Sequence, residues 1–261
     1  MIKAKKSLGQ NFLVDENLLR DIVSTIEIEN KSILEVGPGT GNLTSFILKK
    51  KPKKFLVIEK DKNLAVFLKK KFKDRITIIN DDILKVNERN LCNEKLNVFG
   101  NLPYNISTEI LIKWILNLGS EVWFEKLILM FQKEVADRII SEFNTSTYGR
   151  LSIMCNWRLN IKKIIDIKPN SFKPKPKVDS TLLIFTPKEK FFNLDSPKTI
   201  EKITRIFFNQ KRKKIKKSFN LLFNNADLVA EKLQINLNLR PQNLDYEDYY
   251  LIAKEFENLR N

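Results

Sequence analysis

Short apolar runs alternate with amphipathic stretches over the first two thirds of the chain. Each run is too short for a helix and is rich in β-branched or aromatic residues, which favours strands. We expect strands at residues 32–36, 54–58, 75–79, 95–99 and 126–131. Between the runs, apolar residues recur every three or four positions, so we expect helices from residue 42 and at residues 62–72, 109–118 and 134–142. This alternation predicts an α/β protein whose mostly parallel sheet is covered on both faces.

The pattern changes after residue 157. Two further strands are expected at residues 161–167 and 180–185, on either side of a loop that three prolines make extended and stiff. From residue 196 the apolar spacing is helical throughout, at residues 197–208, 211–223, 226–234 and 247–259. We therefore expect two domains, a catalytic α/β domain over residues 1–190 and a small all-helical domain over residues 191–261.

The composition of the 261-residue chain excludes several kinds of site. Without histidine it cannot build a histidine general base, a Ser-His-Asp triad or a histidine-ligated zinc centre. Cys92 and Cys155 lie far apart, so we expect no metal site and a reducing compartment, the cytoplasm. No apolar run approaches the ~18 residues of a membrane span, and the start of the chain lacks the apolar core of a signal peptide, so no membrane association is expected.

Positive charge is concentrated in one part of the sequence. The formal net charge is +16. Residues 162–217 contain 17 Lys or Arg and 5 Asp or Glu, whereas residues 219–261 contain 4 basic and 7 acidic residues. A uniform preference for lysine would not separate the two regions in this way, so we expect a polyanionic partner, nucleic acid.

The basic region includes a stretch with helical spacing, residues 209–219. Its apolar residues, including Ile215 and Phe219, fall on one face, and basic residues cover the rest. Such a surface either keeps the protein soluble or binds RNA phosphates, which position a substrate without reading its sequence. We favour phosphate contacts, made by Lys213, Lys214, Lys216 and Lys217.

A glycine-rich turn follows the first expected strand, in the sequence LEVGPGTGNLT at residues 34–44. Glycines at positions 37, 39 and 41 allow a tight turn and a close approach of the backbone to a ligand. Position 42 is asparagine, so the G-x-G-x-x-G pattern of dinucleotide-binding proteins is not matched. The G-x-G-x-G pattern after Glu35 instead indicates S-adenosylmethionine, which has no pyrophosphate.

Two carboxylates at later strand ends support a nucleoside ligand. Glu59 ends the second strand and can accept hydrogen bonds from both ribose hydroxyls. Asp82, with Asp81 as an alternative, ends the third strand and can accept a hydrogen bond from an adenine amino group. Ligands of parallel sheets bind at the carboxyl ends of strands, so Gly37, Glu59 and Asp82 are expected to share one site.

The fourth strand ends in GNLPYNIST, residues 100–108. Adenine N6 is a weak nucleophile because its lone pair is delocalised, and acceptors aimed at its two N–H hydrogens would pull it towards tetrahedral geometry. The Asn101 side-chain oxygen and the Leu102 carbonyl can act as those acceptors. Pro103 stiffens the backbone, and Tyr104 can stack on a base turned out of its helix. The alternative is an ordinary strand–helix turn capped by a serine or threonine.

Taken together, these motifs resemble the ribosomal RNA adenine dimethyltransferases, specifically the small-subunit group known from kasugamycin resistance. The resemblance covers nearly the whole chain and rests on KKSLGQNFLVD, LEVGPGTGNLT, VIEKD, NDDIL, NLPYNIS, MFQKEVADRI, YGRLSI and FKPKPKVDS, in the family's order. It implies a Rossmann-like class I methyltransferase fold that uses S-adenosylmethionine. It also implies N6,N6-dimethylation of two adjacent adenosines in the 3′-terminal hairpin loop of 16S rRNA, and a role in small-subunit biogenesis.

The resemblance implies roles for individual residues as well. It assigns cofactor contacts to Asn11, Leu13, Gly37, Glu59, Asp82 and Asn101. It implies that Phe172 stacks on the target base opposite Tyr104. One departure is the isoleucine after Asp82, where the family has a smaller residue, so the adenine slot is expected to be tighter. The implied partner is rRNA within an immature small subunit, and we expect a monomer.

Two alternatives remain open. The large-subunit dimethyltransferases known from macrolide resistance share the fold and chemistry, but LGQNFL, NLPYNIS and FKPKPKVDS favour the small-subunit group. A non-catalytic RNA-binding assembly or transcription factor on the same scaffold would be expected to lose the glycines or the Asn-Leu-Pro-Tyr set, and both are intact. A cytosine-C5 methyltransferase is excluded because no cysteine lies at the catalytic strand end.

Overall fold

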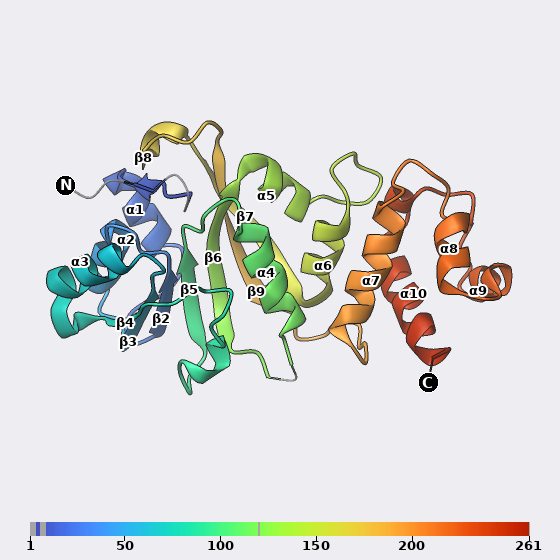
Figure 1. Ribbon diagram of the computed structural model, residues 1–261, viewed down its shortest axis with the longest axis horizontal. Coiled ribbons are helices and arrows are strands. Elements are labelled where there is room, and N and C mark those ends of the chain that lie inside the picture. The colour runs from blue at the N-terminus through green and yellow to red at the C-terminus, as the bar shows by residue number, and fades with distance from the viewer. Residues whose placement is uncertain (1–3, 6–8, 120, 261) are drawn as a thin grey trace. The chain divides into compact units, whose positions relative to one another are not determined.

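The computed structural model describes residues 4–5, 9–119 and 121–260 (Figure 1). Its strands are β1 (Phe12–Leu13), β2 (Ser32–Val36), β3 (Lys54–Ile58), β4 (Thr77–Ile79), β5 (Leu96–Gly100), β6 (Phe124–Gln132), β7 (Leu159–Ile167), β8 (Phe172–Lys173) and β9 (Ser180–Pro187). Its α-helices are α1 (Glu16–Val23), α2 (Asn42–Lys49), α3 (Lys62–Phe72), α4 (Ser107–Leu116), α5 (Lys133–Ile139), α6 (Arg150–Arg158), α7 (Pro197–Phe208), α8 (Lys216–Leu222), α9 (Ala226–Lys232) and α10 (Tyr246–Asn258).

Seven strands form one sheet in the order β4-β3-β2-β5-β6-β9-β7. The strands from β4 to β6 in this order pair in parallel, and β9 pairs antiparallel with β6. The prediction of a mostly parallel α/β sheet is therefore confirmed. The strand order changes direction between β2 and β5, and open α/β sheets bind ligands beyond the carboxyl ends of the strands at such a point. A separate antiparallel pair joins β1 to β8.

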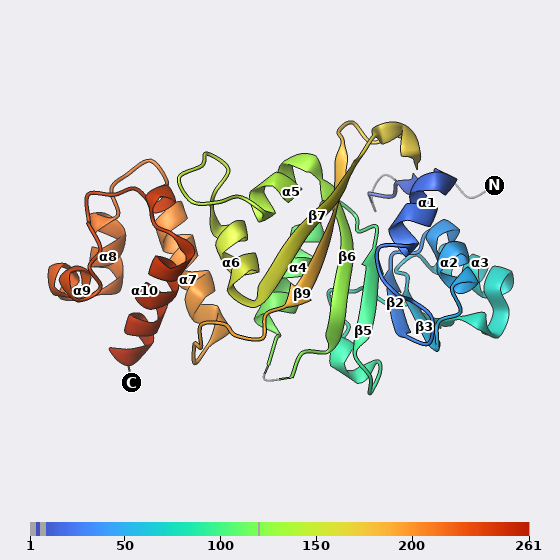
Figure 2. The same ribbon diagram turned by 180° about the vertical axis from the view of Figure 1, so that it is seen from behind.

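The central strands β2, β3 and β5 are almost wholly buried because both of their faces are covered. Every residue of β2 is buried, and Ile33 shares a core cluster with Leu19 of α1 and Ile47 of α2. Helix α4 lies in front of β9 in Figure 1 and behind it in Figure 2, so it lies on one face of the sheet at this strand. Burial of this core positions the polar strand ends that follow it.

The chain divides into two compact units. The first contains the described residues up to 113 and those of 118–136 and 162–187, and it holds most of the sheet. The second contains residues 114–117 and 137–161 and the described residues from 188 onward. Residues 137–161 thus join the second unit although they precede residue 190. The division into a catalytic domain over residues 1–190 and a helical domain over residues 191–261 stays a prediction.

Aromatic side chains form much of the core of the second unit. The ring centroid of Phe207 on α7 lies 5.8 Å from that of Phe219 on α8 and 5.4 Å from that of Tyr249 on α10. All three side chains are fully buried. The helical pattern predicted after residue 196 is therefore explained by one shared apolar cluster.

Two of the expected elements differ in the structure. The expected strand at 75–79 is shorter because a 3-10 turn occupies Lys73–Arg75. The helix expected at residues 211–223 begins only at Lys216. There the N–H groups of Ile215 and Lys216 donate to the Leu239 and Leu237 carbonyls, and these long-range bonds replace helical ones. Helices α1 and α6 were not expected from the sequence.

Candidate active site

A pocket lies at the carboxyl ends of β2, β3, β4 and β5. Five short segments and one further residue line it: residues 9–13, 35–40 with 42–43, 58–60, 81–83 and 101–106, and Met130. The lining includes every residue expected to contact the cofactor or the reacting amine, namely Asn11, Leu13, Gly37, Glu59, Asp82, Asn101, Leu102, Pro103 and Tyr104. The structure therefore brings together residues that are spread over almost one hundred positions of the sequence.

The turn after β2 requires glycine. Gly37 and Gly39 have φ angles of +70° and +57°, a region that disfavours side chains. A Cβ atom at Gly39 would lie only 2.7 Å from Cδ1 of Phe12, so glycine is also needed for Phe12 to pack over the turn. The Gly37 N–H donates to the Ile58 carbonyl at 2.9 Å and ties the turn to the end of β3.

Glu59 is held rigidly at the end of β3. Its Oε2 accepts from the Gly39 N–H at 3.2 Å, and its Oε1 accepts from the Asp61 N–H at 2.9 Å. Burial raises the pKa of Glu59, and these two backbone hydrogen bonds act in the opposite direction. A carboxylate has about four acceptor sites, so roughly two remain for ligand hydroxyls.

Glu35, expected only as the acidic residue before the glycine pattern, also lines the pocket. It is 2% exposed, and its Oε2 accepts from the Thr44 hydroxyl at 2.6 Å. Burial raises the pKa of Glu35 to about 8. The pocket thus contains two glutamates in different surroundings: Glu59 accepts hydrogen bonds from two backbone N–H groups, whereas Glu35 is protonated at neutral pH.

Asp82 lies at the edge of the pocket beyond β4. Its Oδ2 forms an ion pair with Lys60 Nζ at 2.8 Å, and its Oδ1 accepts from the Leu84 N–H at 3.1 Å. The Lys60 ammonium lowers the pKa of Asp82, with help from the Leu84 N–H. Asp82 is therefore ionised, and its remaining lone pairs can accept an amino group. Asp81 lines the same edge but is more exposed.

The orientation of the Asn101 amide is fixed by a distant backbone group. Asn101 Nδ2 donates to the Asn11 carbonyl at 2.7 Å. A carbonyl can only accept, so the NH2 side of the amide must face it, and Oδ1 faces away. Asn101 therefore presents an acceptor, as expected for a group that holds an adenine amine.

The N-terminal segment that carries Asn11 is itself anchored in the first unit. The Asn42 side chain donates to the Leu13 carbonyl at 2.7 Å. Strand β1 pairs with β8, so that Leu13 lies opposite Phe172, and the Val14 N–H donates to the Ser171 carbonyl at 2.8 Å. The N-terminal segment thus forms one wall of the pocket in the described part of the chain.

Tyr104 lines the pocket, and its hydroxyl lies 2.5 Å from Ser180 Oγ. Burial raises the pKa of Tyr104, so the phenol stays protonated. Phe172 is only 3% exposed and belongs to the core cluster, and it is not among the described residues that line the pocket. Phe172 therefore has no surface in the pocket of this structure. Its stacking role opposite Tyr104 stays a prediction.

The four lysines expected to bind RNA lie in the second unit. Lys213 and Lys214 belong to the turn before α8, and Lys216 and Lys217 to its first turn; all four are exposed. Lys214 donates to Asn238 Oδ1 at 2.9 Å, and Lys216 forms an exposed ion pair with Asp227 at 3.1 Å. The positive end of a helix dipole disfavours cations, so these lysines do not stabilise α8.

Two negative findings concern the described residues alone. They contain no cluster of three or more Cys, Asp or Glu side chains arranged to hold a metal ion. Among them there is also no helix with the length and apolar character needed to cross a membrane.

Comparison with known proteins gives consistent matches. The family model for ribosomal RNA adenine dimethylase matches residues 1–258. Ribosomal RNA small subunit methyltransferase A of Pelagibacter ubique (strain HTCC1062) is 66% identical over 259 residues, which are 99% of each chain. A dimethyladenosine transferase from Plasmodium falciparum has a TM-score of 0.78 at 26% identity, over 95% of this chain and 98% of its own.

The 23S rRNA methyltransferase ErmE has a TM-score of 0.69 at 22% identity, over 95% of this chain and 100% of its own, which is a likeness of fold alone. With the Plasmodium falciparum structure, it confirms the predicted fold class, an α/β methyltransferase with a helical C-terminal region.

Proposed function

Because this chain belongs to the ribosomal RNA adenine dimethylase family, we propose that it methylates N6 of two adjacent adenosines in the 3′-terminal hairpin loop of 16S rRNA. The product is N6,N6-dimethyladenosine, and the methyl donor is S-adenosylmethionine. The observation that supports the proposal is the Asn101 amide, which lines the pocket and whose NH2 group is engaged by the Asn11 carbonyl, so that its oxygen is left to accept.

The residues of the pocket fit this donor. The free lone pairs of Glu59 suit a ribose diol, and those of the ionised Asp82 suit the adenine amino group. The glycine turn allows the backbone to approach the ligand closely. When bound, S-adenosylmethionine supplies an electrophilic methyl group on a sulfonium centre.

The chain contributes to the reaction by orienting the nucleophile. Asn101 Oδ1 and the Leu102 carbonyl accept the two N–H hydrogens of the target amine and direct its lone pair towards the donor. Pro103 has no N–H to compete for these acceptors and restricts the backbone. Tyr104 stacks on the target base once it is turned out of the RNA helix. Each transfer forms an N–C bond, breaks the donor's S–C bond and releases one N6 proton to water. After the first methylation one N–H remains to donate to one of these acceptors, so a second transfer can follow.

The RNA is bound mainly through its phosphates. Lys213, Lys214, Lys216 and Lys217 are exposed in the second unit and contact the backbone of the substrate. Such contacts position the RNA, while the shape of the loop and the extruded adenine select the target. The proposed substrate is 16S rRNA within an immature small subunit, and the chain acts in the cytoplasm as a monomer.

The alternative of a large-subunit substrate is not favoured. The relative at 66% identity is named as a small-subunit enzyme, whereas ErmE resembles the chain in fold at 22% identity. A non-catalytic role on this scaffold is also not favoured, because the glycine turn and the Asn101 geometry are intact.

The direct test is methyl transfer from labelled S-adenosylmethionine to immature small subunits and, separately, to large subunits, with the modified nucleosides identified by mass spectrometry. We expect N6,N6-dimethyladenosine at two adjacent positions near the 3′ end of 16S rRNA. Labelled large subunits with unlabelled small subunits would contradict the substrate, and a product that stops at one methyl group would contradict dimethylation.

A further inference from the structure

Ser180 connects the start of β9 to the proposed catalytic strand end. Its Oγ lies 2.5 Å from the hydroxyl of Tyr104, which is 76 positions earlier in the chain. Ser180 is 0% exposed, and in the sheet it lies opposite Gln132 of β6. This bond joins a completely buried residue to the far end of the ring that is proposed to stack on the target base.

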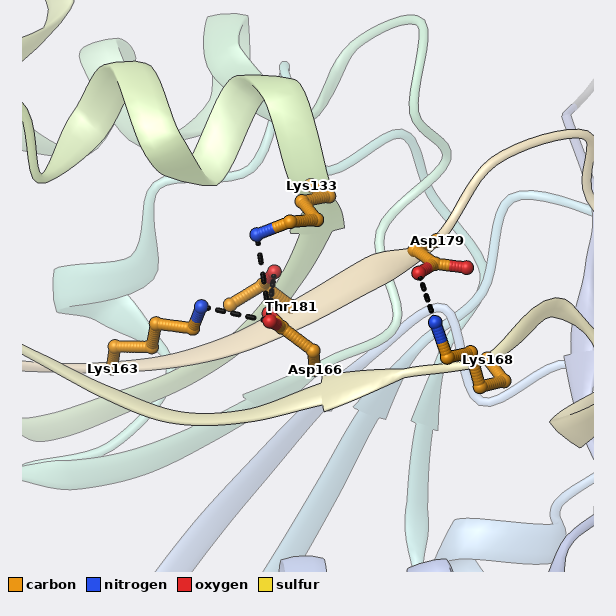
Figure 3. A network of polar contacts seen from close by, with 6 residues as sticks. All are labelled: Lys133, Lys163, Asp166, Lys168, Asp179 and Thr181. Atoms are coloured by element: carbon orange, nitrogen blue, oxygen red, sulfur yellow. Dashed lines mark hydrogen bonds and ion pairs between the residues drawn. The ribbon is translucent and has the colours of Figure 1, made fainter.

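Polar contacts fix the residues on both sides of Ser180 (Figure 3). Before it, Asp179 pairs with Lys168 Nζ at 2.7 Å, and the Asp179 carbonyl accepts from the Lys133 N–H at 2.9 Å. After it, the Thr181 hydroxyl donates to Asp166 Oδ1 at 2.6 Å. The first residues of β9 are therefore tied to β7, to the residue after β7 and to the start of α5.

Asp166 is the centre of this network (Figure 3). Its Oδ2 lies 2.8 Å from Lys163 Nζ and 3.4 Å from Lys133 Nζ. The Lys163 ammonium and the Thr181 hydroxyl lower the pKa of Asp166 to about 2. Asp166 therefore stays ionised at any pH at which the enzyme would work, and these contacts persist.

We propose that Ser180 is a positioning residue for methyl transfer: its hydroxyl holds the far end of the Tyr104 ring in the place from which the ring stacks on the target adenine. This inference rests on the proposed function. A hydrogen bond at the far end of a tyrosine ring restricts the first side-chain torsion, because a turn about that torsion would carry the hydroxyl away from its partner. The network around Asp166 and Asp179 supplies the rigid support that such a hydrogen bond needs.

A double-mutant cycle tests the pair. Ser180→Ala and Tyr104→Phe should each lower kcat by about tenfold with little change in the KM for small subunits, because only the fixed position of the ring is lost. The double variant should be no slower than either single variant, since both remove the same bond. Calorimetry should show S-adenosylmethionine affinity within about twofold of the parent, because the hydrogen bond involves neither Glu59 nor Asp82.

Ser32→Ala provides a matched control. Ser32 is also a buried serine at the first residue of a strand, and its hydroxyl donates to Glu94 at 2.8 Å, but it does not line the pocket. It should lower stability without lowering kcat, and Ser180→Cys, which keeps a weak donor, should recover part of the rate. Parental kcat in Ser180→Ala, or losses that multiply in the double variant, would overturn the proposal.

A readout without turnover separates this inference from the proposed function. With 3-fluorotyrosine at position 104, the free enzyme should give one sharp 19F resonance, and Ser180→Ala should shift or broaden it, whereas Ser32→Ala should not. If the parent enzyme methylated no adenosine while Ser180→Ala still changed the resonance, the proposed function would fail, but the positioning of Tyr104 by Ser180 would stand. An unchanged resonance in Ser180→Ala would show that Ser180 does not position the Tyr104 ring, and would overturn the inference.

Discussion

Glu35→Gln should stabilise the first unit increasingly as the pH rises from 5 to 8. Glu35 is 2% exposed, and its pKa is about 8 in the folded protein against 4.5 ordinarily. Between these values the unfolded chain has lost the proton that the folded protein keeps. The folded state then binds more protons, so the free energy of unfolding falls as the pH rises. Glutamine resembles the protonated acid in shape and can still accept from Thr44, but it does not titrate.

The size of the effect follows from the two pKa values. Linkage through Glu35 costs roughly 1 kcal/mol of stability at pH 5 and roughly 4 kcal/mol at pH 8. The variant should therefore gain about 3 kcal/mol over the parent across this interval. Above pH 8 the folded protein also loses the proton, and the difference should level off.

Hydrogen exchange of the β2 amides, compared between parent and variant at each pH, measures this difference in the unit that contains Glu35. Comparison at equal pH cancels the titration of other groups. Glu94→Gln is the control: Glu94 is exposed, and Lys53 lowers its pKa, so its profile should stay flat over the same range. Parallel pH profiles for the parent and Glu35→Gln would refute the assignment of a protonated, buried Glu35.

Three further changes probe the site and the RNA surface. Glu59→Gln turns one acceptor into a donor that faces a backbone N–H, so S-adenosylmethionine affinity measured by calorimetry should fall by about 1–3 kcal/mol; unchanged affinity would remove Glu59 from the site. Asn101→Asp loses the donor to the Asn11 carbonyl. Both this variant and Asn101→Ala should lower kcat at saturating cofactor far more than they lower small-subunit binding. Near-parental turnover in both would exclude the proposed role of Asn101. Glutamine at Lys213, Lys214, Lys216 and Lys217 should weaken binding to small subunits and flatten its salt dependence, by about one slope unit per lost phosphate contact, while cofactor affinity stays the same. The control replaces four exposed lysines of the first unit by glutamine: Lys62, Lys69, Lys70 and Lys73. This control set should leave the salt dependence at the parental value. Equal salt dependence for both sets would indicate that the lysines before and in α8 only form a solvated surface.

Much of the fold and of the pocket could be predicted from the sequence because the signals are local. Continuous apolar runs mark strands that are buried on both faces, and each turn that follows them carries its own polar residues. Parallel pairing then brings those turns to one edge of the sheet, which is why Gly37, Glu59, Asp82 and Asn101 line the same pocket. Helix α1 was not predicted, although its start has a local signal: the Asp15 side chain caps it by accepting from two backbone N–H groups.

Other features were decided by the tertiary structure, because they depend on partners far away in the chain. The Asn101 amide is oriented by a carbonyl 90 positions earlier, and Tyr104 is held by a hydroxyl 76 positions later. The basic stretch before Lys216 has a helical pattern, yet hydrogen bonds to the carbonyls of Leu237 and Leu239 hold its end outside the helix. Glu35 and Glu59 are the same residue at neighbouring strand ends, and burial raises the pKa of both, but only Glu59 receives two backbone hydrogen bonds that oppose this shift. The sequence shows which groups can ionise or form hydrogen bonds. Their surroundings in the folded protein determine which groups are ionised and which hydrogen bonds form.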